Sequence, residues 1–242
     1  MIKVVDLYKK FQDQEVLRGV NLNIEKGQTL ALIGGSGKGK SVLLKHIIGL
    51  MKPDRGDVFI DQQNIHHLRG RALKALKDQL GVVFQFGALF DSLTIFENVA
   101  FPLNEKTKLN TTQIYERVMK ELTAVGLEND KDKYSAQISG GMRKRVALAR
   151  CLILDPKIIF FDEPTTGLDP VIAQSIYKII RTLQEERKIT ALIVSHEIPG
   201  IFKIVDRVAM LHDGQIILAG TPEEIQTTSN PIVQKFLTGE LE

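Results

Sequence analysis

The chain has 242 residues, of which 43% are hydrophobic and 25% charged, a composition that indicates a globular protein and excludes a disordered one. Its 32 basic and 29 acidic side chains leave a net charge of +3, which is too small to indicate a nucleic-acid-binding protein. We therefore predict a single domain over residues 1–242 and expect no nucleic-acid partner.

The first third of the chain has the pattern of strands joined to a helix. Apolar and polar residues alternate over 20–24, which predicts a half-exposed antiparallel strand. The continuous apolar run 29–33 predicts a buried strand, and the apolar face of 42–48 predicts a helix that ends at Gly49. Further short strands are expected at 58–60 and 82–84.

A glycine-rich loop between that strand and that helix has the pattern G-x-x-x-x-G-K-S, which predicts binding of a nucleoside triphosphate. Its glycines permit conformations in which successive N–H groups point at one anion, and the dipole of the following helix faces the same anion. Lys40 supplies a cation for the β and γ phosphates, and the hydroxyl of Ser41 suits Mg²⁺. A chance glycine-rich turn is the alternative, and the flanking strand and helix count against it. The predicted ATP-binding residues of this segment are Gly34, Gly35, Ser36, Gly37, Lys38, Gly39, Lys40, Ser41 and Val42.

From about residue 86 to residue 152, strand patterns give way to helical ones. Apolar residues recur at helical spacing from Ile114 to Val125. We predict a helical subdomain inserted in the core over 86–152. The single cysteine of the chain, Cys151, is expected to be a packing residue there, without a disulfide or a thiol metal site.

Two acidic residues, Asp162 and Glu163, directly follow the apolar run 158–161. That run and 191–194 predict strands buried on both faces of a parallel sheet. Because ligands bind at the carboxyl ends of such strands, both acids are expected beside the phosphate loop. Asp162 suits a ligand of Mg²⁺, and Glu163 suits a base that orients or deprotonates the attacking water. Two acids on a solvent-exposed turn are the alternative interpretation.

A second anion site is predicted at Ser139-Gly140-Gly141-Met142, where Ser139 is a suitable N-cap and the glycines leave N–H groups accessible. One ATP does not need two helix N-termini separated by a whole subdomain, so this site is expected to serve the ATP of another copy. An ordinary turn before a helix explains the same residues. Two basic clusters are expected on solvated faces, namely Lys9 with Lys10 and Arg143 with Lys144 and Arg145.

The C-terminal part is predicted to contain a hairpin and a helix. Residues 208–218 have the pattern of a hairpin around His212-Asp213-Gly214. Thr221 is expected to cap a helix, in a capping box with Glu224. Apolar residues of 232–237 suggest one more short amphipathic helix, which is a candidate for a contact between two copies.

The sequence also bears on location. No apolar run reaches the roughly 18 residues of a membrane span. The acidic Asp6 interrupts the N-terminal segment before a secretory leader could form. We therefore expect a reducing cytoplasmic compartment, with attachment to a membrane only through a partner protein.

Several motifs occur in an order that resembles the ATP-binding cassette of ABC transporters, and the resemblance covers essentially the whole chain. It implies an α/β fold with a RecA-like P-loop core, an antiparallel β subdomain and the inserted helical subdomain. It also implies that two copies enclose two ATP molecules head to tail. The motifs are the phosphate loop, Gln85, I-S-G-G-M at 138–142, F-F-D-E-P at 160–164, G-L-D at 167–169 and His196.

The same resemblance implies a role for each motif residue. Phe11 would stack on adenine, and His196 would contact the γ phosphate. Taken alone, core packing would be the better explanation for Phe11 and a satisfied strand-end histidine for His196, but their positions in the motif order favour the functional roles. The catalytic residues would be Lys40, Gln85, Glu163 and His196. The residues around Mg²⁺ would be Ser41, Gln85 and Asp162. The residues offered to the second copy would be Ser139, Gly140, Gly141, Met142 and Asp169.

The segment 86–103 resembles the cassette of the Mla-type, MCE-associated phospholipid transporters of Gram-negative envelopes, as does Met142 with Arg143 and Lys144. This implies ATP-driven phospholipid trafficking that maintains outer-membrane lipid asymmetry, from the cytoplasmic side of the inner membrane. The implied partners are an MlaE-like permease, a periplasmic MCE protein and a small STAS-domain protein. The four phenylalanines of the segment could bind an amphipathic helix of a permease. Packing inside the helical subdomain is the alternative interpretation for most of them.

Other functions stay open at this point. A cassette for another cargo, such as amino acids, metal chelates or lipoproteins, would share the catalytic core. A non-transport cassette acting on nucleic acid is a further alternative. An inactive regulatory subunit is disfavoured because Lys40, Asp162, Glu163 and His196 are all present. Lys38 departs from the small or neutral residue usual at its position, and we expect its side chain to project into solvent because the loop turns N–H groups inward.

Overall fold

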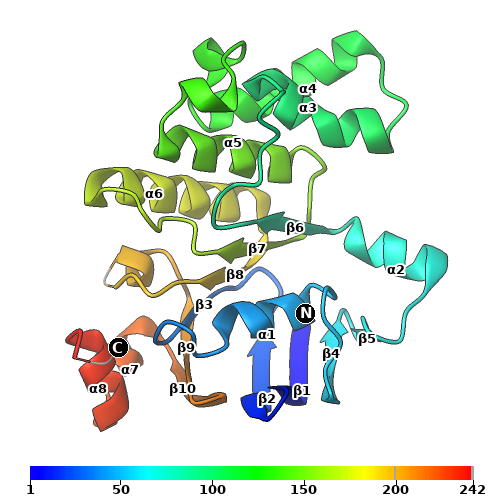
Figure 1. Cartoon of the computed structure of the whole chain (residues 1–242). Coiled ribbons are helices and arrows are strands. Elements are labelled where there is room, and N and C mark those ends of the chain that lie inside the picture. Colours follow the sequence, from blue (N-terminus) through cyan, green and yellow to red (C-terminus); the bar gives the residue numbers. More distant parts are fainter. Residues whose placement is uncertain (199, 241–242) are drawn as a thin grey trace.

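The computed structural model describes residues 1–198 and 200–240, which form two β-sheets with a helix between them and helices on the outer face of the larger sheet (Figure 1). The smaller sheet is antiparallel and has the order β2-β1-β4-β5. Its strands are β1 (Ile2–Phe11), β2 (Gln14–Ile24), β4 (Arg55–Ile60) and β5 (Gln63–Asn64). The strands predicted at 20–24 and 58–60 are therefore confirmed.

The larger sheet is parallel apart from one edge strand and has the order β10-β9-β3-β8-β7-β6. Its strands are β3 (Thr29–Ile33), β6 (Leu80–Val83), β7 (Ile158–Asp162), β8 (Thr190–Val194), β9 (Arg207–His212) and β10 (Gln215–Gly220). The predicted hairpin is the antiparallel pair β9 and β10. The strand expected at 82–84 ends at Val83, and Phe84 beyond it is exposed.

The central strands of this sheet are apolar along most of their length because both faces are covered. In β3, Leu30 and Leu32 belong to one buried cluster, whereas Ala31 and Ile33 belong to the other. Successive side chains of a strand point to opposite faces, so a strand covered on both sides has apolar residues at consecutive positions. The same alternation holds in β7 and β8, which confirms the prediction of strands buried on both faces.

The helix α1 (Lys40–Ile47) lies between the two sheets, where Leu43, Leu44 and Ile47 join the cluster shared by both. On the opposite face of the larger sheet lies the long α6 (Pro170–Arg187) together with α5 (Gly140–Leu152). The helix α2 (Gly70–Lys77) was not predicted; it is short, and Leu76 is its one buried residue.

Between β6 and β7 the chain is helical, and these helices lie together at the end of the molecule opposite the smaller sheet (Figure 1). They are α3 (Ile95–Lys106), α4 (Thr111–Ala124), the short η1 (Glu128–Asp130) and η2 (Ser135–Gln137), and α5. Capping boxes start α3 at Thr94 and α4 at Asn110. That residues 86–152 form a distinct subdomain within one domain stays a prediction.

The C-terminal segment packs against the larger sheet as short helices: η3 (Gly200–Lys203), α7 (Pro222–Gln226) and α8 (Pro231–Leu237). The capping box of Thr221 and Glu224 is present as predicted. In α8, Val233 and Phe236 are buried in the core of their own chain. The apolar face of this helix is therefore largely used internally, which leaves little of it for a contact with a second copy.

Cys151 is a packing residue, as predicted. It lies in α5 as a free thiol, and a Cβ placed on Gly81 would come within 2.4 Å of its sulfur. Burial raises the pKa of the Cys151 thiol to about 12. The thiol is therefore protonated and unreactive at neutral pH.

Phe160→Ala is expected to lower the free energy of unfolding by about 3–5 kcal/mol, because the ring is fully buried between α1 and the larger sheet and its removal leaves a cavity. Urea unfolding followed by circular dichroism measures this. Leu50→Ala is the control, since that side chain is 61% exposed and its loss should cost no more than about 0.5 kcal/mol. Equal losses in the two variants would contradict the burial described above.

Candidate active site

The candidate site lies at the carboxyl ends of β3, β6, β7 and β8, which meet at one edge because these strands are parallel. A cavity of about 380 Å³ opens there, a size suited to a small-molecule ligand. It also receives Gln14 and Val16 from β2. The predicted residues on its lining are Phe11, Ser36, Gly37, Gly39, Lys40, Ser41, Val42, Gln85, Glu163 and His196.

The phosphate loop owes its shape to its glycines. Gly39, the residue before α1, has a φ of 99°, in the left-handed region that favours glycine. A Cβ at Gly34 would lie 2.2 Å from the carbonyl oxygen of Leu211, so no side chain fits there. The loop therefore turns directly from β3 into the N-terminus of α1, where the helix dipole and free N–H groups favour an anion.

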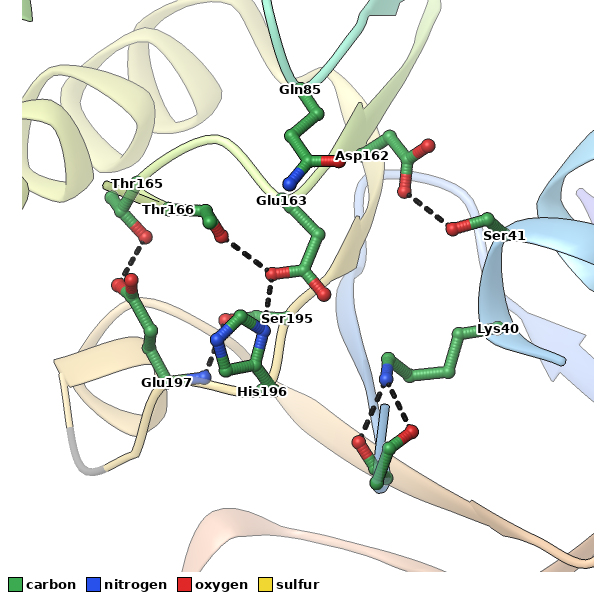
Figure 2. Close-up of polar contacts among 12 residues, drawn as sticks. Lys40, Ser41, Gln85, Asp162, Glu163, Thr165, Thr166, Ser195, His196 and Glu197 are labelled. Atoms are coloured by element: carbon green, nitrogen blue, oxygen red, sulfur yellow. Dashed lines mark hydrogen bonds and ion pairs between the residues drawn. The ribbon is translucent and has the colours of Figure 1, made fainter. Parts of the chain in front are cut away.

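Lys40 is buried at 6% exposure, and its ammonium donates hydrogen bonds to the carbonyl oxygens of Gly34 at 2.7 Å and Gly35 at 2.9 Å. These bonds hold the cation inside the loop (Figure 2). Burial lowers the pKa of Lys40, whereas the carboxylates of Glu163 and Asp162 act in the opposite direction. The loop therefore holds this cation in position for a phosphate.

Ser41 and Asp162 form a pair of hard oxygen donors. The Ser41 hydroxyl donates to Oδ1 of Asp162 at 3.1 Å (Figure 2). Burial raises the pKa of Asp162, and the hydrogen bond from Ser41 partly offsets this. Mg²⁺ in nucleotide sites is bound by few protein oxygens together with phosphates and water, so this pair fits the ion.

Glu163 follows β7 with a φ of 53°, a left-handed conformation that is uncommon for a residue with a side chain. Its Oε2 lies 2.6 Å from Nδ1 of His196 and accepts a hydrogen bond from the Thr166 hydroxyl at 2.8 Å (Figure 2). The Glu163 side chain is 12% exposed, whereas that of His196 is 47% exposed. The carboxylate is thus held in one orientation at the wall of the cavity.

A polar network behind this wall was missed from the sequence. The hydroxyl of Thr165, a buried residue, donates to Oε2 of Glu197 at 2.5 Å and lies 2.8 Å from the hydroxyl of Tyr177. The backbone N–H of Glu197 donates to the Ser195 hydroxyl at 3.0 Å (Figure 2). The network ties the segment after β7 to the segment after β8. Thr165, Ser195 and Glu197 each adjoin a motif residue in the sequence, but their pairing depends on β7 and β8 being neighbours in the sheet.

The residues predicted to serve a second copy do not line this cavity. Ser139 caps α5 by accepting a hydrogen bond from the N–H of Met142 at 3.2 Å, as predicted. Asp169 caps α6 by accepting from the N–H groups of the next turn. A Cβ on Gly141 would lie 2.6 Å from Ile172, so the first turns of α5 and α6 are in contact. Their role toward a second copy stays a prediction.

Lys38 also lies off the lining of the cavity. Its ammonium is 3.4 Å from Oδ1 of Asp213 in the turn between β9 and β10, and its side chain is 34% exposed. The side chain therefore spans the surface between the loop and this turn.

The prediction of solvated basic clusters is wrong for two lysines. Lys9 is half-buried and pairs with Asp54 at 2.8 Å. Lys144 is buried at 8% exposure, and its ammonium donates to the backbone carbonyl oxygens of Gln85 and, at 3.2 Å, Glu163. From the sequence we expected all three basic residues of α5 to face solvent. In the structure Arg143 is exposed, Arg145 is half-buried and Lys144 is buried.

Comparison with known proteins bears directly on this architecture. The profile of the ABC transporter family matches residues 17–166. The chain is 41% identical to the probable ribonucleotide transport ATP-binding protein mkl of Mycobacterium leprae, over 98% of this chain and 69% of that protein. It is 38% identical to the intermembrane phospholipid transport system ATP-binding protein MlaF of Haemophilus influenzae, over 99% of this chain and 91% of that protein.

Among solved structures, the chain is similar to the dimeric post-hydrolysis state of the ATP-binding cassette MJ0796 bound to ADP and Pi. The TM-score is 0.83 and the identity 33%, over 92% of this chain and 99% of that one. This likeness confirms the predicted α/β fold with its RecA-like core. The phosphate loop, the acids beside it and the family match lead to one conclusion: the chain belongs to the ABC transporter family, as an ATP-binding and ATP-hydrolysing cassette.

Proposed function

We propose that this cassette powers phospholipid transport in a bacterial envelope and so maintains the lipid asymmetry of the outer membrane. The observation that carries the hydrolytic role is the meeting of Lys40, Glu163 and His196 on one cavity. The phospholipid cargo is supported by the likeness to MlaF over nearly the whole of both chains. Among the described residues, no helix is both long and apolar enough to cross a bilayer. The likeness to MlaF supports a peripheral position on the cytoplasmic face of the inner membrane as part of the same proposal.

In the proposed reaction the phosphate loop and Lys40 hold the β and γ phosphates. Mg²⁺ would be held by Ser41, Asp162 and the amide oxygen of Gln85, and it would neutralise charge on the phosphates. Glu163 aligns and deprotonates the attacking water, and His196 contacts the γ phosphate. Phosphoryl transfer to water depends on positioning and charge neutralisation more than on a covalent intermediate with the protein. The roles proposed for Lys40, Glu163 and His196 are of this kind.

We propose that a second copy completes each site. The first turns of α5 and α6 present N–H groups and the side chains of Ser139 and Asp169 next to each other, away from the cavity of their own chain. A helix N-terminus is a suitable partner for the γ phosphate of a facing ATP. The dimeric state of the similar MJ0796 cassette supports this arrangement. Phe11 stacks on adenine in the same proposal, since it lies 42% exposed at the mouth of the cavity.

The segment after Gln85 is the proposed docking surface for a transmembrane permease. Phe86 is 85% exposed, and Phe90 and Phe101 pack together at 4.8 Å between ring centroids while both remain partly exposed. Exposed aromatic side chains in one region mark an interaction surface. The proposed partners are an MlaE-like permease and, in the same complex, a periplasmic MCE protein and a STAS-domain protein.

Phe86→Ala is expected to weaken binding of the permease by about 30-fold, the loss typical of a central aromatic anchor. The ATPase activity of the isolated chain should stay within about twofold, because the ring is not on the lining of the cavity. Affinity for the detergent-solubilised permease measures the effect. Leu50→Ala, which removes another exposed apolar side chain, is the control. Unchanged permease affinity in Phe86→Ala would place the docking surface elsewhere.

Purification of the chain from detergent-solubilised membranes, with identification of the bound proteins and lipids, tests the cargo. Recovery of a permease with an MCE protein and phospholipid supports the proposal. A second candidate cargo, ribonucleotides, is raised by the 41% identity to the mkl protein, of whose length this chain spans 69%. Recovery of a permease with an amino-acid, metal-chelate, lipoprotein or nucleotide cargo would replace the phospholipid assignment while leaving the ATPase role in place.

A further inference from the structure

One buried lysine connects three parts of the proposed machinery. Lys144 lies on α5, the helix that Ser139 caps, and its ammonium donates to the backbone carbonyl oxygens of Gln85 and Glu163. The two carbonyls belong to the segments that follow β6 and β7, which are neighbours in the larger sheet. A single side chain therefore joins the helix offered to the second copy, the segment next to the permease surface, and the residue proposed to activate water.

Burying the Lys144 ammonium costs desolvation free energy, and an apolar side chain could fill the same space without that cost. Lys144 is 8% exposed, and burial lowers its pKa, although the carboxylates of Glu197, Glu163 and Asp162 act in the opposite direction. A charged group that is removed from water loses hydration that only good hydrogen bonds replace. A hydrocarbon side chain of the same length could fill the space without that cost. The cation must therefore contribute something that methionine or leucine would not.

Its contribution follows from which atoms it binds. Both acceptors are main-chain oxygens of the residues whose side chains are proposed to act, so the ammonium restrains the peptide units from which those side chains project. Glu163 already has an uncommon left-handed backbone conformation, which such a restraint helps to hold. Charge-assisted hydrogen bonds are shorter and stronger than those between neutral groups.

We propose that Lys144 is a positioning residue: its hydrogen bonds fix the backbone of Gln85 and Glu163 relative to the N-terminus of α5. The inference rests on the proposed roles of Gln85, Glu163 and Ser139 and adds to them a physical link. When a second copy or a permease displaces α5 or the Gln85 segment, the link passes that displacement to Glu163.

The test compares Lys144→Met, which keeps the length and removes every donor, with Lys144→Arg, which keeps the charge and the donors. Steady-state ATP turnover and equilibrium ATP affinity are measured on the full chain. In Lys144→Met we expect kcat to fall about 10- to 100-fold, since a misplaced catalytic group costs this much, with ATP affinity changed by less than about threefold. Lys144→Arg should recover most of the turnover. Lys120→Met, at an exposed position of α4, is the matched control and should behave as the unaltered chain.

A double-mutant comparison separates positioning from a merely structural role. If Lys144 acts partly through Gln85, then Lys144→Met should lower kcat less in a Gln85→Ala background than in the unaltered chain. Equal losses in both backgrounds, or full turnover in Lys144→Met, would overturn the inference. Parallel losses of kcat, ATP affinity and thermal stability that arginine does not restore would overturn it too, because they indicate a defect of folding. Full turnover in Glu163→Gln would instead remove the proposed site itself, so the two failures are distinguishable.

Discussion

Glu163→Gln is expected to lower ATP turnover by about 10²- to 10⁴-fold, the range contributed by a general base, and to leave ATP affinity within about threefold. The amide has nearly the shape of the carboxylate, so the hydrogen bond from Thr166 can persist. The amide cannot take a proton from water, and this is the step that should fail. The contacts to the phosphates come from other residues and should remain.

Because binding persists while hydrolysis stops, Glu163→Gln should also accumulate an ATP-dependent dimer. Crosslinking or light scattering with ATP and Mg²⁺, in the presence and absence of the permease, measures the dimer. Glu116→Gln, at an exposed position of α4, is the control and should turn over ATP normally without a trapped dimer. Undiminished turnover in Glu163→Gln would remove this residue from the catalytic role. A chain that stays monomeric in every condition would refute the proposed head-to-tail pair.

Lys40→Ala is expected to lower ATP affinity by about 10- to 100-fold, because a hydrogen bond to a charged group contributes about 1.5–3 kcal/mol. The ammonium donates hydrogen bonds to the carbonyl oxygens of Gly34 and Gly35, and Lys40 lines the cavity. The cation is thus held within the loop that is predicted to bind the phosphates. Its removal should weaken binding and turnover together.

Lys38→Ser is the matched control for this prediction, since it removes an equal charge two residues away. The Lys38 ammonium lies beside Asp213, so the predicted contribution of this residue to ATP binding is its backbone N–H. ATP affinity should change by less than about threefold, as measured by titration with a fluorescent ATP analogue. A large loss in Lys38→Ser would show that the side chain reaches the phosphates. An unchanged affinity in Lys40→Ala would contradict the assignment of the phosphate loop.

Much of the site was predictable because its parts are local. The glycines of the phosphate loop, the caps Ser139 and Thr221, and the apolar runs before Asp162 depend on neighbours only a few residues away. Such features are determined by steric limits, capping and the two-residue or 3.6-residue period of apolar positions. The expectation that both acids lie near the phosphate loop followed from one general property of parallel sheets.

Side-chain contacts that depend on strand order could not be predicted from local patterns. The pairing of Glu163 with His196 requires β7 and β8 to be neighbours, although the two residues are far apart in the sequence. The same order brings Thr165 to Glu197. The burial of Lys144 depends on the rotation of α5 against the sheet, and a charge run carries no information about that rotation.

Local patterns in the sequence were enough to predict the residues of the phosphate chemistry and the elements that hold them, because glycine turns, caps and apolar periods depend on near neighbours. The contacts that orient side chains across distant segments, such as those of Lys144 with Gln85 and Glu163, depend on the folded arrangement. The reason is energetic. Strand order and helix rotation depend on the apolar surface that the whole chain buries, and this cannot be calculated from any one segment.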